Sequence, residues 1–172
     1  MSRIALDYVE TEPVAFDERL ALGAEDLGED VVSADVAEIR GSVERGGEGY
    51  LVTGTVKGTA RLRCARCLEP FPFLYEEGFE VRLLSVEQAP TDEETRLEPG
   101  ALNVRFYAEP VLDLADLATE QFLLAVPMKP LCSETCRGLC PRCGTNLNRG
   151  NCSCSPETDD RWAPLESWRP SN

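Results

Sequence analysis

Eight cysteines are the residues of this chain whose types and spacing most directly indicate chemistry. They form four short-range pairs, with one to three residues between the two members of each pair. The pairs are Cys64/Cys67, Cys132/Cys136, Cys140/Cys143 and Cys152/Cys154. A short turn brings two sulfurs to one tetrahedral ion, at about 2.3 Å each for zinc, and a second pair completes the four ligands. The pattern therefore predicts two metal sites of four thiolates, with no pair left over.

Three other roles for these cysteines fit the sequence less well. A disulfide framework conflicts with the expected absence of a signal peptide, because disulfides persist in oxidising compartments. A thioredoxin-like redox motif explains one CxxC pair and leaves the others unexplained. An iron–sulfur cluster also uses four thiolates, so spacing alone leaves iron open. We expect two zinc ions, and we expect them to be structural, because four protein ligands leave no open position for water.

The cysteine pairs can be combined into two sites in more than one way. Sequential pairing places Cys64, Cys67, Cys132 and Cys136 on one ion, and Cys140, Cys143, Cys152 and Cys154 on the other. The second group is then local, so closing its loops costs little entropy. The first group closes a much longer loop. A crossed arrangement, in which Cys140/Cys143 join Cys64/Cys67, stays open from spacing alone.

Composition and charge exclude several classes of protein. The chain has 172 residues, of which 42% are hydrophobic, so it can bury a core. It contains no histidine, which excludes histidine-based catalysis. With 31 acidic and 17 basic residues the net charge is −14, so bulk electrostatics do not favour nucleic acid. The first residues, MSRIALDYVETEP, have no apolar core, so we expect no signal peptide, no membrane span, a cytoplasmic location and reduced thiols.

Alternating apolar residues predict a run of strands in the first half of the chain. Residues 37–43 alternate, RGGEG at 45–49 supplies a turn, and residues 50–56 and 79–83 alternate again. The expected inward positions are Ala37, Ile39, Gly41, Val43, Tyr50, Val52, Gly54, Val56, Phe79, Val81 and Leu83. Short turns between consecutive strands favour an antiparallel meander.

One convincing helix is expected over residues 113–126. Asp113 is a suitable N-cap, an apolar stripe follows at helical spacing, and Pro127 ends the helix. The fold class is therefore α+β: an antiparallel β-meander with one main helix and a C-terminal four-cysteine module resembling a zinc ribbon. We expect a β-rich core domain over 1–136, including the first four-cysteine site. A small zinc module and tail over 137–172 are expected to pack on that core.

The remaining segments are patterned more weakly. FDERLAL at 16–22 is compatible with a short helix, and LNVRFYA at 102–108 with one more strand. Residues 86–101 are acidic and punctuated by proline, which is typical of a loop. Trp162, Leu165 and Trp168 are candidate anchors for the tail.

Basic residues gather in the segments that carry the cysteines. Residues 49–68 hold four basic residues and no acidic one, in a chain that is otherwise strongly acidic. Part of this charge neutralises the metal centres, because four thiolates and one dication leave a net −2. The alternative is an edge that binds structured RNA. Its candidate residues are Lys57, Arg61, Arg63, Arg66, Arg137, Arg142 and Arg149.

Four motifs together resemble the YceD family. They are CARCLEPF, AVPMKPLCSETCRGLCPRCGTNLN, the closing CSC and DDRWAPL, and the resemblance spans about residues 32–168. It implies a role in accumulation of large-subunit (23S) ribosomal RNA. Some family members keep only the first part of the cysteine pattern, which favours sequential pairing. The resemblance supplies a biological process and no reaction chemistry.

Two classes of function follow from these observations. The first is a non-enzymatic ribosome-biogenesis factor with structural zinc. Its partner would be large-subunit ribosomal RNA or a basic large-subunit ribosomal protein, with no membrane and no small-molecule substrate. The second is a regulatory or redox protein whose thiols respond to oxidation or to zinc. Thiol reactivity separates them, because structural zinc thiolates react slowly until the ion is chelated.

Overall fold

The three longest strands form the predicted antiparallel meander. The computed structural model describes residues 2–10, 12–22, 27–90, 103–154 and 161. In it β4 (Val36–Gly46) pairs with β5 (Gly49–Arg63), and β5 pairs with β6 (Pro70–Ser85). The register places Val52 opposite Val43 on one side and opposite Val81 on the other. The expected inward residues are buried, except that the two glycines are partly exposed. The alternation therefore predicted these strands and their faces correctly.

Three further strands complete a six-stranded sheet. β2 (Val14–Ala21) pairs antiparallel with β4, and β3 (Val31–Ala34) pairs antiparallel with the end of β5 that β4 leaves free. β7 (Val104–Tyr107) was expected as a strand, and it pairs parallel with the end of β6, which departs from a pure meander. The helix considered for FDERLAL is wrong, since this segment lies in β2.

Cross-strand ion pairs explain why β2 is a strand despite three consecutive charged residues. Asp17 lies opposite Arg40 and Arg19 opposite Glu38 in the register of β2 and β4. Arg40 Nε donates to Asp17 Oδ1 at 3.0 Å, and the Arg19 guanidinium pairs with Glu38. The burial of Phe16 in the core fixes which face of β2 turns inward. Charges that look helical in sequence are therefore matched across a strand pair.

The predicted helix is α1 (Leu114–Ala125), and its start and end have the expected causes. The Asp113 carboxylate accepts hydrogen bonds from the backbone N–H of Ala115 and Asp116, which satisfies two donors of the first turn. Arg3 also donates to Asp113 at 2.9 Å, where β1 (Arg3–Ala5) pairs with β8 (Val111–Asp113). Two short 3-10 helices, Leu6–Tyr8 and Val86–Gln88, complete the described elements.

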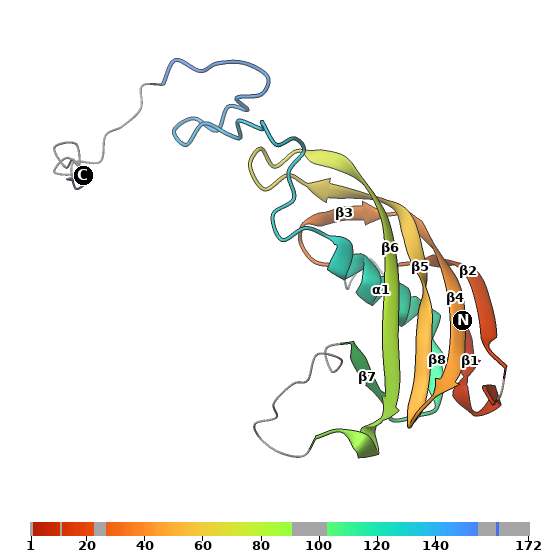
Figure 1. The fold of residues 1–172 in the computed structure, drawn as a ribbon. Helices are drawn as coiled ribbons and strands as arrows, with labels where there is room; N and C mark the ends of the chain where they lie inside the picture. The colour runs from red at the N-terminus through yellow and green to blue at the C-terminus, as the bar shows by residue number, and fades with distance from the viewer. Residues whose placement is uncertain (1, 11, 23–26, 91–102, 155–160, 162–172) are drawn as a thin grey trace, which may run out of the picture.

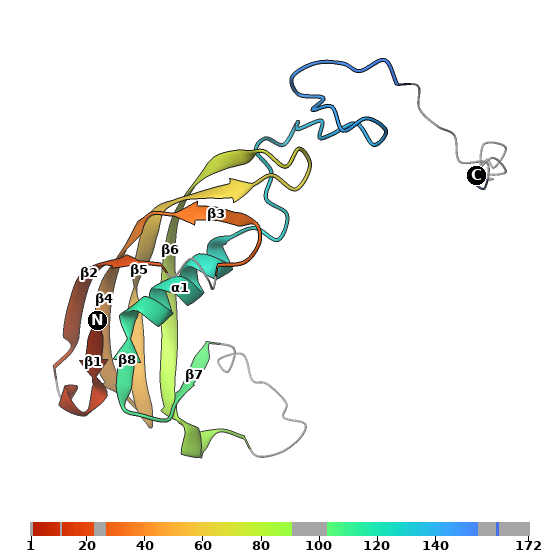
Figure 2. The same cartoon turned by 180° about the vertical axis from the view of Figure 1, so that it is seen from behind.

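The sheet curves around α1, so the core lies between the helix and the concave face (Figures 1 and 2). Leu114, Leu117, Ala118 and Phe122 are buried on the side of α1 that faces the sheet. The Phe122 ring meets the Tyr75 ring edge-on, with centroids 5.0 Å apart. The predicted helical stripe is therefore the centre of the core.

Two glycines face one another at the middle of the sheet and are covered by aromatic rings. Gly41 lies opposite Gly54, and a Cβ added to Gly54 would lie 2.3 Å from the Arg40 carbonyl oxygen and 2.8 Å from Phe79 Cζ. A Cβ at Gly41 would lie 2.7 Å from Phe16 Cζ. The absent side chains allow rings from both flanking strands to pack over the sheet backbone.

Gly54→Ala is expected to destabilise the fold by about 2–3 kcal/mol, because the new methyl group overlaps both a backbone oxygen and a ring. Chemical denaturation followed by circular dichroism measures this as a lower midpoint. Gly78→Ala is the matched control, since the nearest atom to its added Cβ is 3.9 Å away. Equal midpoints for the two variants would contradict this account of the glycine pair.

The described residues define a mostly β structure with one α-helix, in keeping with the α+β class. None of their helices has the length and apolar character needed to cross a bilayer. The cysteine-bearing segment after α1 lies beyond the tip of the β5–β6 hairpin, in blue in Figure 1. Most of the loop predicted for residues 86–101 lies outside the described residues. The candidate tail anchors Trp162, Leu165 and Trp168 all lie outside them. The division into domains 1–136 and 137–172 stays a prediction.

Candidate metal centres

The first cysteine pair lies at the tip of the β5–β6 hairpin. The backbone N–H of Cys64 donates to Glu69 O at 3.0 Å, and that of Leu68 donates to Cys64 O at 2.9 Å. Leu68 has φ +60°, a left-handed conformation that a non-glycine residue rarely adopts. These contacts fold residues 64–69 into a tight turn that holds Cys64 and Cys67 on one side.

The segment after α1 docks against this turn through backbone contacts. Ala65 N–H donates to Pro130 O at 2.8 Å, and Leu139 N–H donates to Arg66 O at 3.2 Å. The Arg66 guanidinium donates to Cys136 O at 2.8 Å and to Glu134 O at 3.2 Å. Arg66 therefore connects the two cysteine-bearing turns, which brings residues distant in sequence to one point.

The sulfurs of Cys64, Cys67, Cys132 and Cys136 all lie within 4.8 Å of one another. Cys64 Sγ and Cys136 Sγ are 3.8 Å apart, and Cys67 Sγ and Cys132 Sγ are 3.7 Å apart. Four ligands at about 2.3 Å in a tetrahedron have edges of about 3.8 Å, whereas a disulfide needs about 2 Å. The donor set therefore fits one tetrahedral ion. Every cysteine of this site except Cys132 is buried.

The remaining cysteines, Cys140, Cys143, Cys152 and Cys154, form a second group with sulfurs within 4.8 Å of one another. Its first turn repeats the geometry of the hairpin tip: Gly144 N–H donates to Cys140 O at 2.9 Å, and Gly144 has φ +72°. The glycine thus adopts the left-handed conformation expected from CPRCG. Cys143 is exposed, and Cys152 and Cys154 are partly exposed. The structure therefore has the sequential arrangement, with one site more enclosed than the other.

The electrostatics of the second group favour a bound cation. The Thr145 hydroxyl and backbone N–H, together with neighbouring sulfurs, lower the pKa of Cys143 to about 6. The ionised Cys143 raises the pKa of Cys154 to about 12, with burial and Cys140 adding to the effect. Four thiolates this close repel one another unless a positive ion lies between them. A divalent metal supplies that charge.

Asn148, which lies between Cys143 and Cys152 in the chain, contacts a sulfur of the first group, a role that the sequence did not reveal. Its Nδ2 lies 3.2 Å from Cys136 Sγ, and its Oδ1 accepts a hydrogen bond of 2.7 Å from the Arg137 backbone N–H. A donor aimed at a ligand sulfur stabilises the thiolate form and fixes its orientation. The amide of Asn148 is therefore engaged within the protein and is not available for contacts with phosphates or bases.

Three basic residues proposed for RNA make ion pairs or hydrogen bonds inside the fold. Lys57 Nζ lies 3.1 Å from Glu38 Oε2, and Arg149 Nη2 lies 2.6 Å from Glu69 Oε2. Arg137 Nη2 donates to Asn151 Oδ1 at 3.0 Å. With Arg66, which donates to backbone carbonyl groups, most of the candidate set therefore already has a partner within the protein.

Arg61 and Arg63 remain the most available members of the set. Both lie on β5 near the hairpin tip, and both are exposed. Neither makes an ion pair or side-chain hydrogen bond with the described residues. Arg142 is exposed on the turn of the second group. The exposed basic surface is therefore smaller than the sequence suggested, and it lies beside the cysteine groups.

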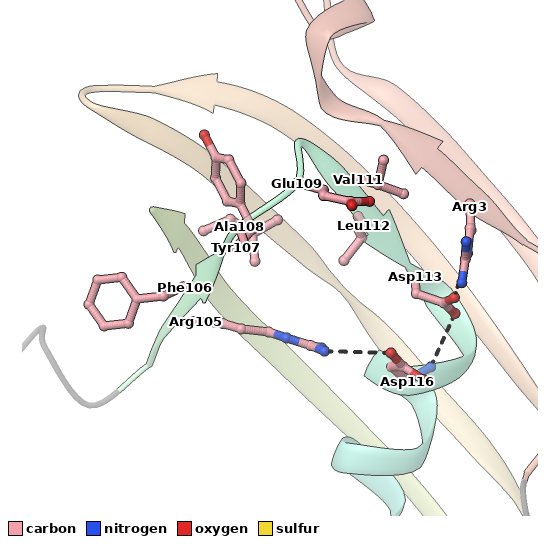
Figure 3. Close-up of a pocket in the computed structure, with 11 residues that line it drawn as sticks. Arg3, Arg105, Phe106, Tyr107, Ala108, Glu109, Val111, Leu112, Asp113 and Asp116 are labelled. Atoms are coloured by element: carbon pink, nitrogen blue, oxygen red, sulfur yellow. Dashed lines mark hydrogen bonds and ion pairs between the residues drawn. The ribbon is translucent and has the colours of Figure 1, made fainter. Parts of the chain in front are cut away.

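A hollow of about 240 Å³ lies at the opposite end of the sheet, between β7, β8 and the start of α1 (Figure 3). Four of its five charged groups pair with one another, Arg3 with Asp113 and Arg105 with Asp116 at 3.9 Å. Arg105 also reaches Glu120 at 3.3 Å. The ion pairs of Arg105 connect β7 to α1, and the pair of Arg3 with Asp113 connects β1 to the start of α1. We therefore assign these charged side chains a structural role.

Comparison with known proteins places the chain in a family. The family described as "Large ribosomal RNA subunit accumulation protein YceD" matches residues 52–168, which include all eight cysteines. The chain therefore belongs to the YceD family.

Relatives of known sequence extend this comparison. An uncharacterised protein of Mycobacterium tuberculosis (strain ATCC 25618 / H37Rv) is 33% identical over 123 residues, covering 72% of this chain and 57% of the relative. A Zea mays protein named Large ribosomal RNA subunit accumulation protein YCED homolog 1, chloroplastic, is 25% identical over 162 residues, covering 79% of this chain and 52% of the relative. The chain thus spans about half the length of these relatives. No solved structure matches it.

Proposed function

We propose that this protein supports accumulation of large-subunit (23S) ribosomal RNA as a non-enzymatic ribosome-biogenesis factor. The observation that carries the proposal is the family match over residues 52–168, a span that contains both cysteine groups. The printed name of the maize relative refers to the same process. We place the protein in the cytoplasm, where the thiols of both groups stay reduced.

We further propose that each cysteine group holds one structural zinc ion. The fit rests on the sulfur separations of 3.8 and 3.7 Å in the first group and on the all-thiolate donor set of both. Zinc bound there would supply a positive centre that holds two turns together, with no open ligand position for a reaction. In the second group this would make the C-terminal segment a small module of the zinc-ribbon type.

The exposed arginines near the hairpin tip are the part of the surface best suited to phosphates. Arg61 and Arg63 lie two positions apart on the same outer face of β5, beside the module that carries Arg142. Guanidinium groups bind phosphate oxygens with two parallel hydrogen bonds. The acidic remainder of the chain would repel nucleic acid elsewhere and so limit contact to this end.

Reversing both charges in an Arg61→Glu/Arg63→Glu variant is expected to lower mature large-subunit ribosomal RNA in cells. Affinity for a large-subunit RNA fragment should fall, and the log–log salt slope should decrease by about one unit for each phosphate that the variant no longer neutralises. The control is Arg45→Glu/Arg82→Glu, which reverses two exposed arginines at the opposite end of the sheet. Equal ribosomal RNA levels in the two variants, with zinc and folding intact, would contradict the proposed RNA surface.

A thiol- or zinc-responsive protein is the second candidate function. The observation that favours it is the partial exposure of the second group, in which Cys143 is exposed and its pKa is lowered to about 6. Titration with a thiol reagent before and after chelation distinguishes the two functions. Rapid reaction of the metal-loaded protein would favour the responsive role.

A further inference from the structure

The strand β6 has an edge that is mostly unpaired within the described part of the chain. β6 pairs with β5 along residues 70–83, but β7 pairs with it only from Arg82 to Ser85. Figure 1 shows β7 beside the lower end of β6 only, with α1 behind the strand. Among the described residues, the stretch of β6 before Arg82 therefore has no partner strand on this side of its backbone.

The free hydrogen-bonding groups along this edge can be assigned. Arg82 N–H donates to Asn103 O at 2.8 Å, so the backbone groups of Arg82 point toward the β7 side. Because successive residues of a strand point alternately to its two sides, the N–H and C=O of Leu74, Glu76, Gly78 and Glu80 point the same way. Residues 74–80 thus offer the donors and acceptors of a short strand, about 20 Å long.

Proline limits where another strand can pair. Pro70 and Pro72 fall in the same alternation as Leu74, so the N–H that each lacks would have pointed to the open edge. Prolines on an edge strand discourage pairing with another chain. The β6 edge is blocked in this way near the hairpin tip, and it is left unblocked along residues 74–80.

A cleft of about 230 Å³ lies between this edge and the helix. Gln121 of α1 lines it, and although this residue is only 8% exposed its side chain makes no hydrogen bond with the described residues. Leu124, which is 74% exposed, also lines the cleft. Among the described residues Tyr75 Oη is the one buried side-chain polar atom without a partner, so the Gln121 amide reaches solvent within the cleft. An added strand would bring hydrogen-bonding groups to this amide and would cover Leu124.

The charges along the β6 edge indicate the charge that a partner segment should carry. Glu76, Glu77 and Glu80 are exposed and make no ion pair within the described residues. Residues 70–81 contain no lysine or arginine. The edge therefore repels phosphate groups and favours a chain that carries lysine or arginine.

The same charges disfavour a second copy of this chain as the partner. In an antiparallel pair centred on Gly78, Glu76 of one copy would lie opposite Glu80 of the other. Like charges directly opposite one another destabilise a strand pair. A basic segment of a different protein avoids this repulsion.

We propose that residues 74–80 of β6 bind an extended lysine- or arginine-rich segment of a partner protein by strand addition. The backbone groups of the edge would give the affinity, and the three glutamates and the Gln121 cleft would select the side chains. The site is separate from the arginines of β5, and it does not depend on RNA binding or on the ribosomal role. Its failure and that of the proposed function are therefore distinguishable.

A fluorescein-labelled synthetic peptide of about nine residues, alternating lysine and valine, is a suitable probe for this strand. Binding to the full chain is measured by fluorescence anisotropy, and amide exchange by NMR. We expect the peptide to bind and to slow exchange at Leu74, Glu76, Gly78 and Glu80. The same peptide with alternate backbone amides methylated is expected not to bind, because it cannot complete the ladder.

Two variants at one position separate strand addition from attraction by charge. Gly78→Pro removes one outward N–H and is expected to weaken binding about tenfold or more. Gly78→Ala keeps that N–H, and its Cβ has space, so it should bind like the natural protein. Glu76→Gln/Glu80→Gln should weaken binding about tenfold at low salt and less at high salt. Glu18→Gln/Glu44→Gln, which neutralises two exposed glutamates elsewhere, should have little effect.

Several outcomes would overturn the proposal. No binding of the basic peptide would refute it, and binding that Gly78→Pro leaves unchanged would show attraction by charge alone. Slow exchange at residues 74–80 before peptide is added would mean that the edge is already paired. Displacement of the peptide by an RNA oligonucleotide, with RNA protecting the same amides, would assign the edge to nucleic acid. Self-association that protects these amides would assign it to a second copy.

Discussion

Cys64→Ser is expected to destabilise most of the protein, whereas Cys140→Ser is expected to release one zinc ion and leave the sheet folded. The first substitution removes a ligand from the site that joins the β5–β6 hairpin to the segment after α1. The second removes a ligand from a site whose cysteines all lie within residues 140–154. The two substitutions should differ in effect because an ion in the first site would connect distant segments, whereas an ion in the second site would connect only nearby residues.

The magnitudes support a large difference between the two variants. In the sequence 64 residues separate Cys67 from Cys132, and eight separate Cys143 from Cys152. Closing the longer loop costs about 2 kcal/mol more, at about 0.6 kcal/mol per doubling of length. Cys64 is also fully buried, at 0% exposure. We expect a loss of about 2–5 kcal/mol for Cys64→Ser, as for removal of a long-loop crosslink. Cys140→Ser should cost the sheet about 1 kcal/mol or less.

Denaturant unfolding followed by the circular dichroism of the strands measures both values, and elemental analysis counts the metal. The natural protein should hold two zinc ions, and Cys140→Ser should hold one. Arg66→Ala is a useful companion variant, because it keeps every sulfur but removes the hydrogen bonds to Cys136 O and Glu134 O. Equal destabilisation by Cys64→Ser and Cys140→Ser would refute the view that the two sites differ in structural role.

The sequence predicted those parts of the fold that local patterns determine. The alternation in β4, β5 and β6 and the Asp113 cap of α1 each depend on a few neighbouring residues, and all agree with the structure. That residues 14–21 form the strand β2 could not be predicted in this way, because the strand depends on residues of β4 that lie opposite it. Asp17 and Arg19 can be understood only when Arg40 and Glu38 are known to lie opposite. The parallel pairing of β7 likewise depends on a connection that sequence periodicity does not specify.

The cysteine groups were more predictable than the residues around them. Spacing within each pair is a local property, and it identified all eight sulfurs that the structure gathers into two groups. The basic residues were judged from charge alone, and charge does not reveal a partner. Lys57 and Arg149 each meet a glutamate brought close only by folding, Glu38 and Glu69. Asn148 carried no distinguishing signal beyond its place among the cysteines.

The turns at residues 64–68 and 140–144 also differ in the residue that adopts the left-handed conformation, which the sequence did not predict for the first turn. Gly144 follows Cys143 and adopts φ +72° without strain, whereas Leu68 follows Cys67 and adopts φ +60°. A leucine in the left-handed region costs about 1–2 kcal/mol. The surrounding contacts of the hairpin tip and the docked segment must hold it there. The need for these contacts agrees with a first cysteine group that forms part of the packing between the hairpin tip and the segment after α1.

Chelation is expected to remove the two zinc ions in separate phases, the second site first. A chelator or competing thiol reagent must approach the metal through an exposed ligand, and Cys143 is exposed while Cys152 and Cys154 are partly exposed. In the first site Cys64, Cys67 and Cys136 are buried, and only Cys132 is exposed. Release from the first site also requires the hairpin tip to separate from the segment after α1. We expect the two rates to differ by about tenfold or more, since such an opening of about 1.4 kcal/mol already gives a factor of ten.

A zinc-sensitive dye in the presence of excess chelator measures the release. The natural protein should give two phases of equal amplitude, and Cys140→Ser should give the slow phase alone. Strand circular dichroism should stay constant through the fast phase and decrease with the slow one, because only the first site crosslinks the hairpin to the segment after α1. A single phase, or loss of strand signal during the fast phase, would show that the sites act as one cooperative unit. The second group would then be part of the main fold, and the boundary expected after residue 136 would be wrong.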